Sequence, residues 1–293
     1  MSQPIFHRNI QVNGLNIFYR EAGPADAPTL LLLHGFPSSS RQFVKLMEAL
    51  ADRFHLVAPD YPGFGLSDAP APGAFTYSFD SLAGVVEGFC EALGLNRFVA
   101  YLFDFGAPIG LRLAERHPEW IAGLVIQNGN SYEEGLSPMA RDLVALRPGR
   151  PGAAEAVMGV LTLEVTKSQY LGGAREPERI APEGWLLDQH FLDLPGRKPI
   201  QVDLALDYHR NVERYPAWQA WLREHRPPAL IVWGRNDAFF PAAGAQAYLR
   251  DLPEAELHLL DTGHFALEED VEVIAARMAA FVERLRPQPA TAR

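Results

Sequence analysis

The most informative stretch of the chain is Tyr101-Leu102-Phe103-Asp104-Phe105-Gly106-Ala107-Pro108-Ile109-Gly110. The apolar run 96–102 predicts a short strand, and the pattern of 108–117 predicts a helix that follows it closely. A sharp strand-to-helix turn pushes one side chain, here Asp104, out beyond the end of its strand. The helix start behind this turn favours a negative charge, so we expect an ionised carboxylate directed into a cleft, as a carboxylate nucleophile requires. The alternative is that Asp104 only caps the helix, which is a common role of Asp.

Strands and helices alternate on both sides of this stretch. Alternating residues around Asn13-Gly14 predict a hairpin over 5–12 and 15–21. Continuous apolar runs predict buried strands at 29–33, 56–59, 121–127, 229–233 and 256–260. Helical spacing occurs at about 41–51, 78–93, 243–251 and 266–286. Together with the strand at 96–102, this alternation predicts an α/β fold with a mostly parallel, eight-stranded sheet flanked by helices.

The rhythm of strand and helix breaks between residues 131 and 221. This segment has helical patches, many Pro and Gly residues and many aromatic side chains, but it has no run typical of a strand. We interpret it as a helical cap inserted over the sheet. The predicted domains are therefore a core of residues 1–130 and 222–293, and a cap of residues 131–221.

Composition excludes several classes of protein. The net charge of −10 argues against a nucleic-acid partner, and no apolar run approaches the roughly 18 residues that span a bilayer. The segment Met1-Ser2-Gln3-Pro4 lacks the features of a signal peptide, and a single cysteine, Cys90, excludes internal disulfides, so we expect a cytoplasmic protein. The nine His residues show no metal-ligand spacing. We expect no metal, no cofactor and no membrane partner, and a monomer or homodimer.

Reactive side chains follow the ends of the predicted strands. Open parallel sheets bind their ligands beyond the carboxyl ends of the strands. The residues at or just after these ends are His34, Asp60, Asp104, Asn128, Asp237 and His264. Three of them, Asp104, Asp237 and His264, stand in the chain order nucleophile, acid and histidine.

This order, with a cap after the sixth strand, resembles the α/β-hydrolase fold family over nearly the whole chain. The motifs that carry the resemblance are His34-Gly35-Phe36-Pro37, the loop 60–68, the Asp104 turn, Trp233-Gly234 with Asp237, and Gly263-His264. An Asp at the turn is similar to the branch that contains epoxide hydrolases and haloalkane or haloacid dehalogenases. Leu102 is larger than the small residue usual in relatives at its position, so we expect a slightly more open turn.

An aspartate nucleophile favours attack on a saturated carbon. It needs no base, and its attack on an ester would give an unfavourable anhydride, whereas attack on an alkyl carbon gives an ordinary ester. We therefore predict a hydrolase that forms an alkyl-enzyme ester on Asp104. His264 then activates water, and Asp237 orients the imidazole. The backbone N–H groups of Phe36 and Phe105 form the oxyanion hole.

The resemblance to epoxide hydrolases implies a cap tyrosine that protonates the opening oxygen. The matching segment reads Asp207-Tyr208-His209-Arg210-Asn211, so His209 stands where that tyrosine is expected. Tyr208 is one residue away, or about 100° around a helix. Further candidates for donating to or contacting substrate are Tyr132, Tyr170, Tyr215 and Trp185, each of which also fits a packed aromatic. We expect His34 to act in the site by orienting the oxyanion loop through hydrogen bonds.

Several alternatives remain open at this point. Haloalkane dehalogenases usually hold the halide with a Trp after the nucleophile and a second Trp or Asn, but Phe105 and Phe36 occupy these positions and offer no side-chain N–H. We therefore rank an epoxide hydrolase first and a haloalkane or haloacid dehalogenase second. An esterase or lactonase that uses Asp104 as a base, and a non-catalytic small-molecule binder, are further alternatives. The apolar floor formed by Phe36, Phe103 and Phe105 predicts a small, uncharged, hydrophobic substrate.

Overall fold

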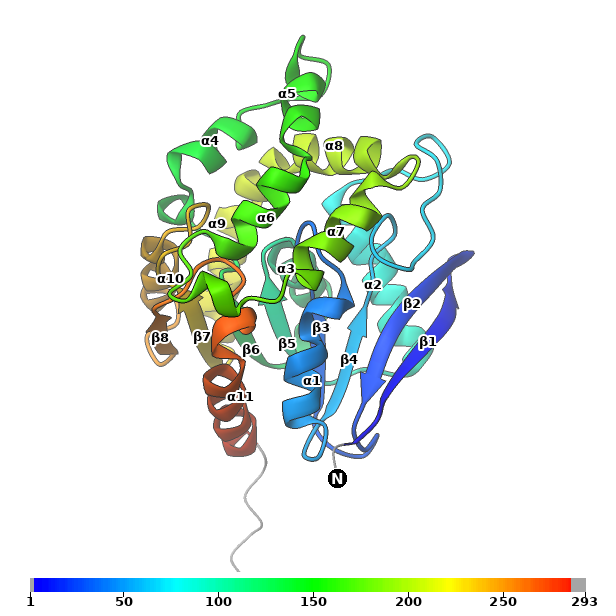
Figure 1. The fold of residues 1–293 in the computed structure, drawn as a ribbon. Helices are drawn as coiled ribbons and strands as arrows, with labels where there is room; N and C mark the ends of the chain where they lie inside the picture. Colours follow the sequence, from blue (N-terminus) through cyan, green and yellow to red (C-terminus); the bar gives the residue numbers. More distant parts are fainter. Residues whose placement is uncertain (1–2, 286–293) are drawn as a thin grey trace, which may run out of the picture.

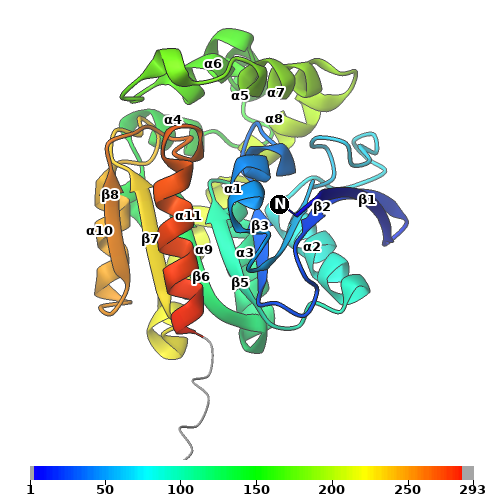
Figure 2. The ribbon, with the colours of Figure 1, turned by 60° about the horizontal axis from the view of Figure 1, so that its bottom comes forward.

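The computed structural model describes residues 3–285, which form an eight-stranded sheet with helices on both faces (Figures 1 and 2). The strands are β1 (Ile5–Val12), β2 (Leu15–Ala22), β3 (Thr29–Leu33), β4 (His55–Pro59), β5 (Phe98–Phe103), β6 (Ile121–Gln127), β7 (Ala229–Gly234) and β8 (Glu256–Leu260). Their order in the sheet is β1-β2-β4-β3-β5-β6-β7-β8. Only the pairings of β2 with β1 and β4 are antiparallel, which confirms the predicted mostly parallel sheet.

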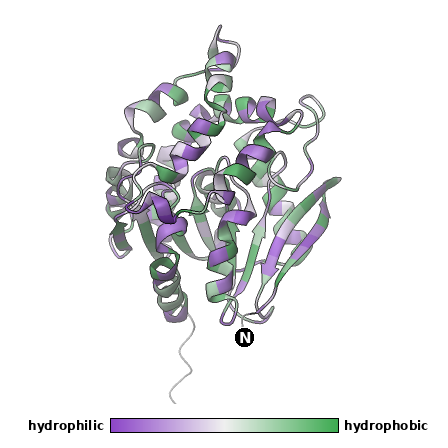
Figure 3. Ribbon diagram, in the orientation of Figure 1, coloured by the Kyte–Doolittle hydropathy of each residue, from purple (hydrophilic) through white to green (hydrophobic). Residues whose placement is uncertain are grey.

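Helices cover both faces of the sheet because its central strands are apolar on both sides. In β3, Leu31 and Leu33 pack into a cluster with α2 (Phe79–Leu93) and α3 (Gly106–Arg116). Leu30 and Leu32 pack on the opposite face with α1 (Val44–Leu50) and α11 (Leu267–Arg284). Figure 3 shows hydrophobic residues concentrated in the central strands, whereas β1 and β2 at the edge carry many hydrophilic ones.

The turn after β5 is tighter than the sequence indicated. The strand continues to Phe103, and α3 already begins at Gly106, two residues before the predicted start at Pro108. Pro108 is tolerated there because the first N–H groups of a helix have no partner within the helix. The predicted helix over 41–51 is likewise divided, into a 3₁₀ turn, η1 (Ser40–Phe43), and α1.

The segment between β6 and β7 is helical throughout its regular structure. It contains α4 (Pro138–Val144), α5 (Ala153–Val160), α6 (Leu163–Leu171), α7 (Glu183–Asp193), α8 (Arg197–Asp207) and α9 (His209–His225). Figure 2 shows α4 to α8 lying as a layer across one end of the sheet, and α9 packs against α3 of the core. Helix α9 continues past Trp221, so the predicted boundary between cap and core falls inside this helix.

No helix within residues 3–285 combines enough length with enough hydrophobicity to cross a membrane.

Candidate active site

Asp104 lies at the tip of the turn between β5 and α3. Its φ of 47° is left-handed, a conformation that non-glycine residues adopt rarely and that is concentrated at functional sites. Two glycines make the turn possible. A Cβ on Gly35 would lie 2.4 Å from the Asp104 Cβ, and a Cβ on Gly106 would lie 2.2 Å from the Leu33 carbonyl oxygen. Larger residues at either position would displace the Asp104 turn.

Leu102 is accommodated by a third glycine in α3. The Leu102 side chain is fully buried, and a Cβ on Gly110 would lie 2.3 Å from its Cδ2. Leu102, two residues before Asp104, therefore fits because Gly110, which packs against it from α3, has no side chain.

Asp104, His264 and Asp237 meet although they lie far apart in the chain. His264 Nδ1 lies 2.6 Å from Asp237 Oδ2, and His264 Nε2 lies 3.8 Å from Asp104 Oδ2. The first contact is a short, charge-assisted hydrogen bond, and the second is too long for a direct one. All three side chains are buried. The His264 imidazole is therefore held at Nδ1 by Asp237, and its Nε2 faces the Asp104 carboxylate.

Asp237 is held by several further donors. Its Oδ1 accepts from the backbone N–H groups of Phe239, at 2.8 Å, and Phe240, at 3.1 Å. Its Oδ2 accepts from Asn128 Nδ2 at 2.7 Å as well as bonding His264. These bonds fix the carboxylate that orients the imidazole.

For Asn128, the sequence predicts only that a polar residue follows the end of a strand. In the structure its amide also donates to the Gly234 carbonyl at 3.2 Å and accepts from the Gly234 N–H at 2.9 Å. It joins the end of β6 to the loop that carries Asp237, from a left-handed φ of 46° that Asn tolerates. The position of Asn128 after a strand end therefore predicts that it lies near the site, but it does not predict its hydrogen-bond partners.

The Asp104 carboxylate accepts the two backbone N–H groups predicted for the oxyanion hole. The Phe36 N–H donates to Oδ1 at 2.6 Å, and the Phe105 N–H also hydrogen-bonds to this carboxylate. Helix α3 has no side-chain cap, so Asp104 does not act as a helix cap. One carboxylate oxygen is held by N–H donors, while Oδ2 faces His264.

Burial and neighbouring charges set the protonation of the site. Burial raises the pKa of Asp104, against the opposing effects of His264 and the two N–H groups, so this carboxyl is harder to ionise than an exposed one. Burial disfavours the charged form of His264, but Asp237 and Asp104 together raise its pKa above the ordinary value. Loss of the Asp104 charge, as in an ester, removes one of the interactions that keep His264 protonated.

A cavity of about 460 Å³ opens above Asp104, Phe36, Phe105 and His264. Most of its wall is apolar and comes from cap helices, including Leu143, Val144, Val157, Leu161, Val165 and Ala205. The polar lining residues are Ser168, Gln169, Gln201 and Tyr208. Met139 and Val160, which are 45% and 37% exposed, mark where the cavity reaches the surface.

Tyr208 is the predicted phenol that the fold brings into this cavity. Its ring packs edge-on against Phe79, with centroids 5.5 Å apart, and lies 5.9 Å from the Phe105 ring. Its hydroxyl is hydrogen-bonded to that of Tyr215, which accepts from Asn130 Nδ2 at 3.2 Å. If residues 207–211 formed one helix, Tyr208 would point about 100° away from the position expected for the tyrosine. In fact Tyr208 lies at the junction of α8 and α9, where a single helical rotation does not apply.

The other predicted substrate-binding residues do not line the cavity. The phenols of Tyr132 and Tyr170 donate to buried carboxylates, those of Asp251 and Asp188 respectively. Trp185 packs against Tyr170, and His209 Nδ1 bonds the Leu206 carbonyl at 2.8 Å. These side chains find their partners within the packing of the cap and core.

His34 also lies outside the cavity lining, behind the oxyanion loop. Its ring stacks on Tyr61 at 4.0 Å, its Nε2 accepts from the Tyr61 N–H at 3.3 Å, and its Nδ1 donates to the Gly35 carbonyl at 3.1 Å. Burial lowers the pKa of His34 to about 3, so the ring is neutral. These contacts are those of a residue that orients the loop rather than one that touches substrate.

Comparison with known proteins agrees with this architecture. The family model for the alpha/beta hydrolase fold matches residues 28–271. An uncharacterised hydrolase of Saccharomyces cerevisiae is 40% identical over 275 residues, covering 92% of this chain and 94% of that protein. Haloalkane dehalogenase 2 of Mycobacterium tuberculosis is 41% identical over 272 residues, covering 88% of this chain and 87% of that protein.

Solved structures show the same fold. A haloalkane dehalogenase from Bradyrhizobium elkani superposes with a TM-score of 0.80 at 23% identity, covering 96% of this chain and 99% of that one. An epoxide hydrolase from Vigna radiata superposes with a TM-score of 0.75, also at 23% identity, covering 96% of this chain and 98% of that one. The chain thus belongs to the α/β-hydrolase fold family, and its relatives support a hydrolase.

Proposed function

We propose that this hydrolase opens epoxides through an alkyl-enzyme ester on Asp104. The observation that supports the proposal is that Tyr208 lines the same cavity as Asp104. A carboxylate supplies the nucleophile, and a phenol supplies the proton that the leaving alkoxide requires. Both groups line an apolar space whose floor contains His264.

In the first step, Asp104 Oδ2 attacks a ring carbon of the epoxide. The new C–O bond forms as the ring C–O bond breaks, and the departing oxygen takes the proton of Tyr208. Burial, together with Tyr215 and Asp104, raises the pKa of Tyr208 well above its ordinary value, so the phenol carries its proton before the reaction. An alkoxide is a stronger base than a phenolate, so this transfer is still favourable.

In the second step, water attacks the carbonyl carbon of the ester. His264 Nε2 takes the proton of this water, and Asp237 stabilises the imidazolium. The N–H groups of Phe36 and Phe105 stabilise the oxyanion that develops on the former carboxylate. Collapse of this intermediate expels the alkoxide, which takes the proton remaining on the oxygen that came from water, so that a diol is released and the Asp104 carboxylate is restored. The imidazolium proton returns the phenolate to a phenol through solvent.

The cavity favours an uncharged, apolar substrate. Asp104 and His264 are the ionisable residues besides Tyr208 among its described lining residues. A charged group elsewhere in the substrate would therefore lose its hydration without gaining a partner. Apolar carbon atoms, in contrast, gain from burial against the cap helices.

Dehalogenation is the second candidate, favoured by the 41% identical relative named haloalkane dehalogenase 2. Displacement of a halide requires donors that stabilise the departing anion, but no proton transfer. Phe36 and Phe105 flank Asp104, and no Trp or Asn occurs among the described lining residues. The lining thus lacks the Trp and Asn donors that the resemblance to haloalkane dehalogenases implies, although Gln169, Gln201 and Tyr208 also carry donors, so we rank dehalogenation second.

Single turnover in ¹⁸O-labelled water tests the covalent route. Hydrolysis of an alkyl ester transfers the label to the Asp104 carboxylate, whereas a route in which Asp104 acts only as a base leaves the protein unlabelled. The substrates are styrene oxide, a 1-bromoalkane and a nitrophenyl ester, followed by diol, bromide and nitrophenol release. Label in the Asp104 peptide with diol formation supports the proposal, and bromide release without diol formation favours the second candidate.

The matched variants are Tyr208→Phe and Tyr132→Phe. Both remove a buried phenol hydroxyl, but only Tyr208 lines the cavity. Loss of a general acid lowers the rate by about 10²–10⁴-fold, so Tyr208→Phe should slow epoxide opening by at least about 100-fold. Tyr132→Phe should leave the rate of epoxide opening close to that of the unmodified enzyme. Equal rates for the two variants would contradict the role of Tyr208.

A further inference from the structure

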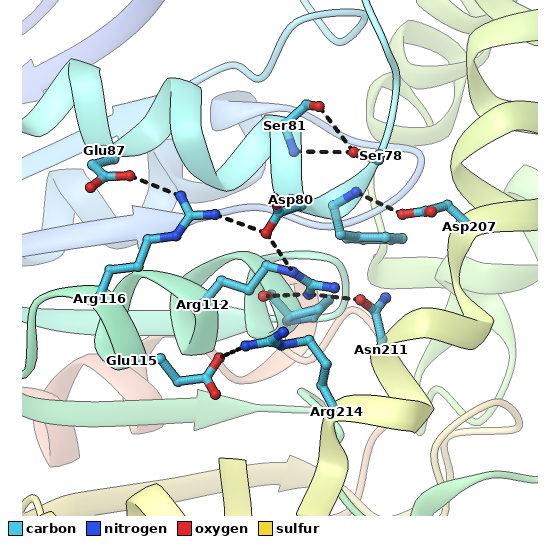
Figure 4. A network of polar contacts seen from close by, with 12 residues as sticks. Ser78, Asp80, Ser81, Glu87, Arg112, Glu115, Arg116, Asp207, Asn211 and Arg214 are labelled. Carbon is cyan, nitrogen blue, oxygen red and sulfur yellow. Dashed lines mark hydrogen bonds and ion pairs between the residues drawn. The ribbon is translucent and has the colours of Figure 1, made fainter. Parts of the chain in front are cut away.

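The proposed acid and the nucleophile belong to different parts of the fold. Asp104 follows a strand of the sheet, whereas Tyr208 lies between two helices of the segment inserted after β6. Their separation therefore depends on the contacts that hold α8 and α9 against the core. Figure 4 shows these contacts, made by Asp207 and Asn211, in a network that joins α2, α3 and α9.

On one side of Tyr208, the Asp207 carboxylate binds the start of α2. Its Oδ2 accepts from the backbone N–H of Phe79, the first residue of this helix, at 2.9 Å (Figure 4). This N–H has no partner within the helix, and the positive end of the helix dipole favours a carboxylate there. The Phe79 ring packs edge-on against both the Tyr208 ring, 5.5 Å away, and the Phe105 ring, 4.8 Å away. Asp207 thus ties the Tyr208 backbone to the residue on which the Tyr208 ring packs.

On the other side, Asn211 binds a buried arginine of α3. Its Oδ1 accepts from Arg112 Nη1 at 2.7 Å, and the same Nη1 donates to the Pro108 carbonyl at 3.0 Å (Figure 4). The backbone N–H of Asn211 donates to the Tyr208 carbonyl at 2.8 Å. Arg112 therefore connects Tyr208 to the helix that begins directly behind Asp104.

We propose that Asp207, Asn211 and Arg112 are positioning residues, which hold the Tyr208 phenol at the distance from Asp104 that epoxide opening needs. This inference rests on the proposed function. Asp207 and Asn211 flank Tyr208, and their side chains bind α2 and α3 respectively. The Tyr208 phenol therefore has little freedom to move relative to Asp104. Misplacement of a reacting group by about 1 Å can lower a rate about 100-fold.

A purely structural role is the alternative, because buried polar contacts also stabilise folds. Arg112 and Asn211 are both buried, and Arg112 lies over the Trp218 ring at 5.3 Å. The chain offers a matched control in the ion pair between Arg214 and Glu115, with N–O separation 2.7 Å. This pair joins the same two helices, α9 and α3, but lies three residues further along each helix than the Asn211–Arg112 contact and is partly exposed.

Asn211 allows a matched pair of substitutions. Asn211→Leu has a similar size but removes the acceptor of Arg112. Asn211→Asp keeps the acceptor, and it sacrifices only the Nδ2 group, which has no hydrogen-bond partner among the described residues. We expect Asn211→Leu to slow formation of the alkyl-enzyme by about 10- to 100-fold in single turnover. We expect Asn211→Asp to restore the rate to within about threefold, and Arg214→Gln to leave it unchanged.

A double-mutant cycle with Tyr208→Phe separates positioning from stability. If Asn211 acts through the phenol, Asn211→Leu slows alkylation in the native enzyme but has little further effect, less than about twofold, when Tyr208 is already Phe. If Asn211 only supports the fold, the two effects multiply, and this result would overturn the inference. If Asn211→Leu does not fold, as judged by circular dichroism, Asp207→Ala replaces it in the same cycle, with the same two outcomes.

The failure of the proposed function is distinguishable from the failure of this inference. Asp104→Asn that still turns over epoxide shows that the nucleophile is wrongly assigned. Tyr208→Phe with an unchanged alkylation rate shows that there is no acid to position, and it overturns the inference as well. A slow Tyr208→Phe enzyme together with multiplicative effects in the cycle overturns the inference alone.

Discussion

Replacement of Asn128 by Gly tests whether the loop that carries Asp237 is held from β6. Gly is the appropriate replacement because Asn128 has a left-handed φ of 46°, which Gly adopts without strain. The variant removes a hydrogen bond to the Asp237 carboxylate and two to the backbone of Gly234. A hydrogen bond to a charged group contributes about 1.5–3 kcal/mol, and a neutral one about 0.5–1.5 kcal/mol. The sum predicts that the free energy of unfolding falls by about 2.5–6 kcal/mol.

The same variant should affect only one of the two chemical steps. Asp104 and Tyr208 make no hydrogen bond to Asn128, so alkylation should proceed at nearly the normal rate. Hydrolysis depends on His264, which is oriented by Asp237, and it should slow as this carboxylate loses a donor. The alkyl-enzyme should therefore accumulate during turnover, and intact-protein mass spectrometry would detect it.

The assay is urea unfolding followed by circular dichroism, with Asn9→Gly as the control. Asn9 accepts a hydrogen bond from the Asn16 amide at an exposed site, so its loss should change the free energy of unfolding by about 1 kcal/mol or less. A change below about 1 kcal/mol for Asn128→Gly would refute the argument that these buried bonds hold the loop. Equal slowing of both chemical steps would refute the assignment of Asn128 to the hydrolytic half of the site.

The remaining predictions concern the base, its titration and the cavity mouth. His264→Gln should allow alkylation but block hydrolysis, so that the mass of the Asp104 peptide increases by that of the substrate; normal turnover would contradict the assignment of the base. Protonation of His264 removes the base, so hydrolysis of the intermediate should slow as the pH falls through the pKa that His264 has in the ester. Asp237 and the Asp104 charge raise the pKa of His264 in the free enzyme, and the ester lacks the Asp104 charge. Hydrolysis should therefore lose its rate at a lower pH than that at which His264 titrates in the free enzyme, and equal values would contradict this coupling. In a series of 1,2-epoxyalkanes, kcat/KM should rise about fourfold per added methylene while the chain still lies within the apolar cavity. Val160→Asp at the mouth should weaken this dependence on chain length. Leu186→Asp is the control, because Leu186 is 50% exposed on α7 and does not line the cavity, and it should leave the dependence unchanged. The absence of any dependence on chain length would rule out an alkyl-binding role for the cavity.

Local patterns along the chain are enough to predict the layers of the fold and the order of the proposed reacting groups. Apolar runs such as Thr29–Leu33 mark strands that are covered on both faces, because each residue of such a run must be buried. The tight turn at Asp104 and the positions of Asp237 and His264 after strand ends follow from local patterns. Parallel strands bring these ends to one edge, so three residues far apart in the chain could be assigned to one site.

The polar groups that surround this site cannot be predicted from local patterns, because they depend on how distant segments pack. In the sequence, Tyr208 and Tyr132 are both aromatic residues of the inserted segment. In the structure, Tyr208 lines the cavity, whereas Tyr132 donates to Asp251, a residue distant in the chain. Periodicity along one helix cannot predict where a side chain points when two helices meet at it, as they do at Tyr208. The partners of Asn128 and Asn211 are likewise supplied by other segments, because hydrogen bonds between distant elements exist only once these elements have packed.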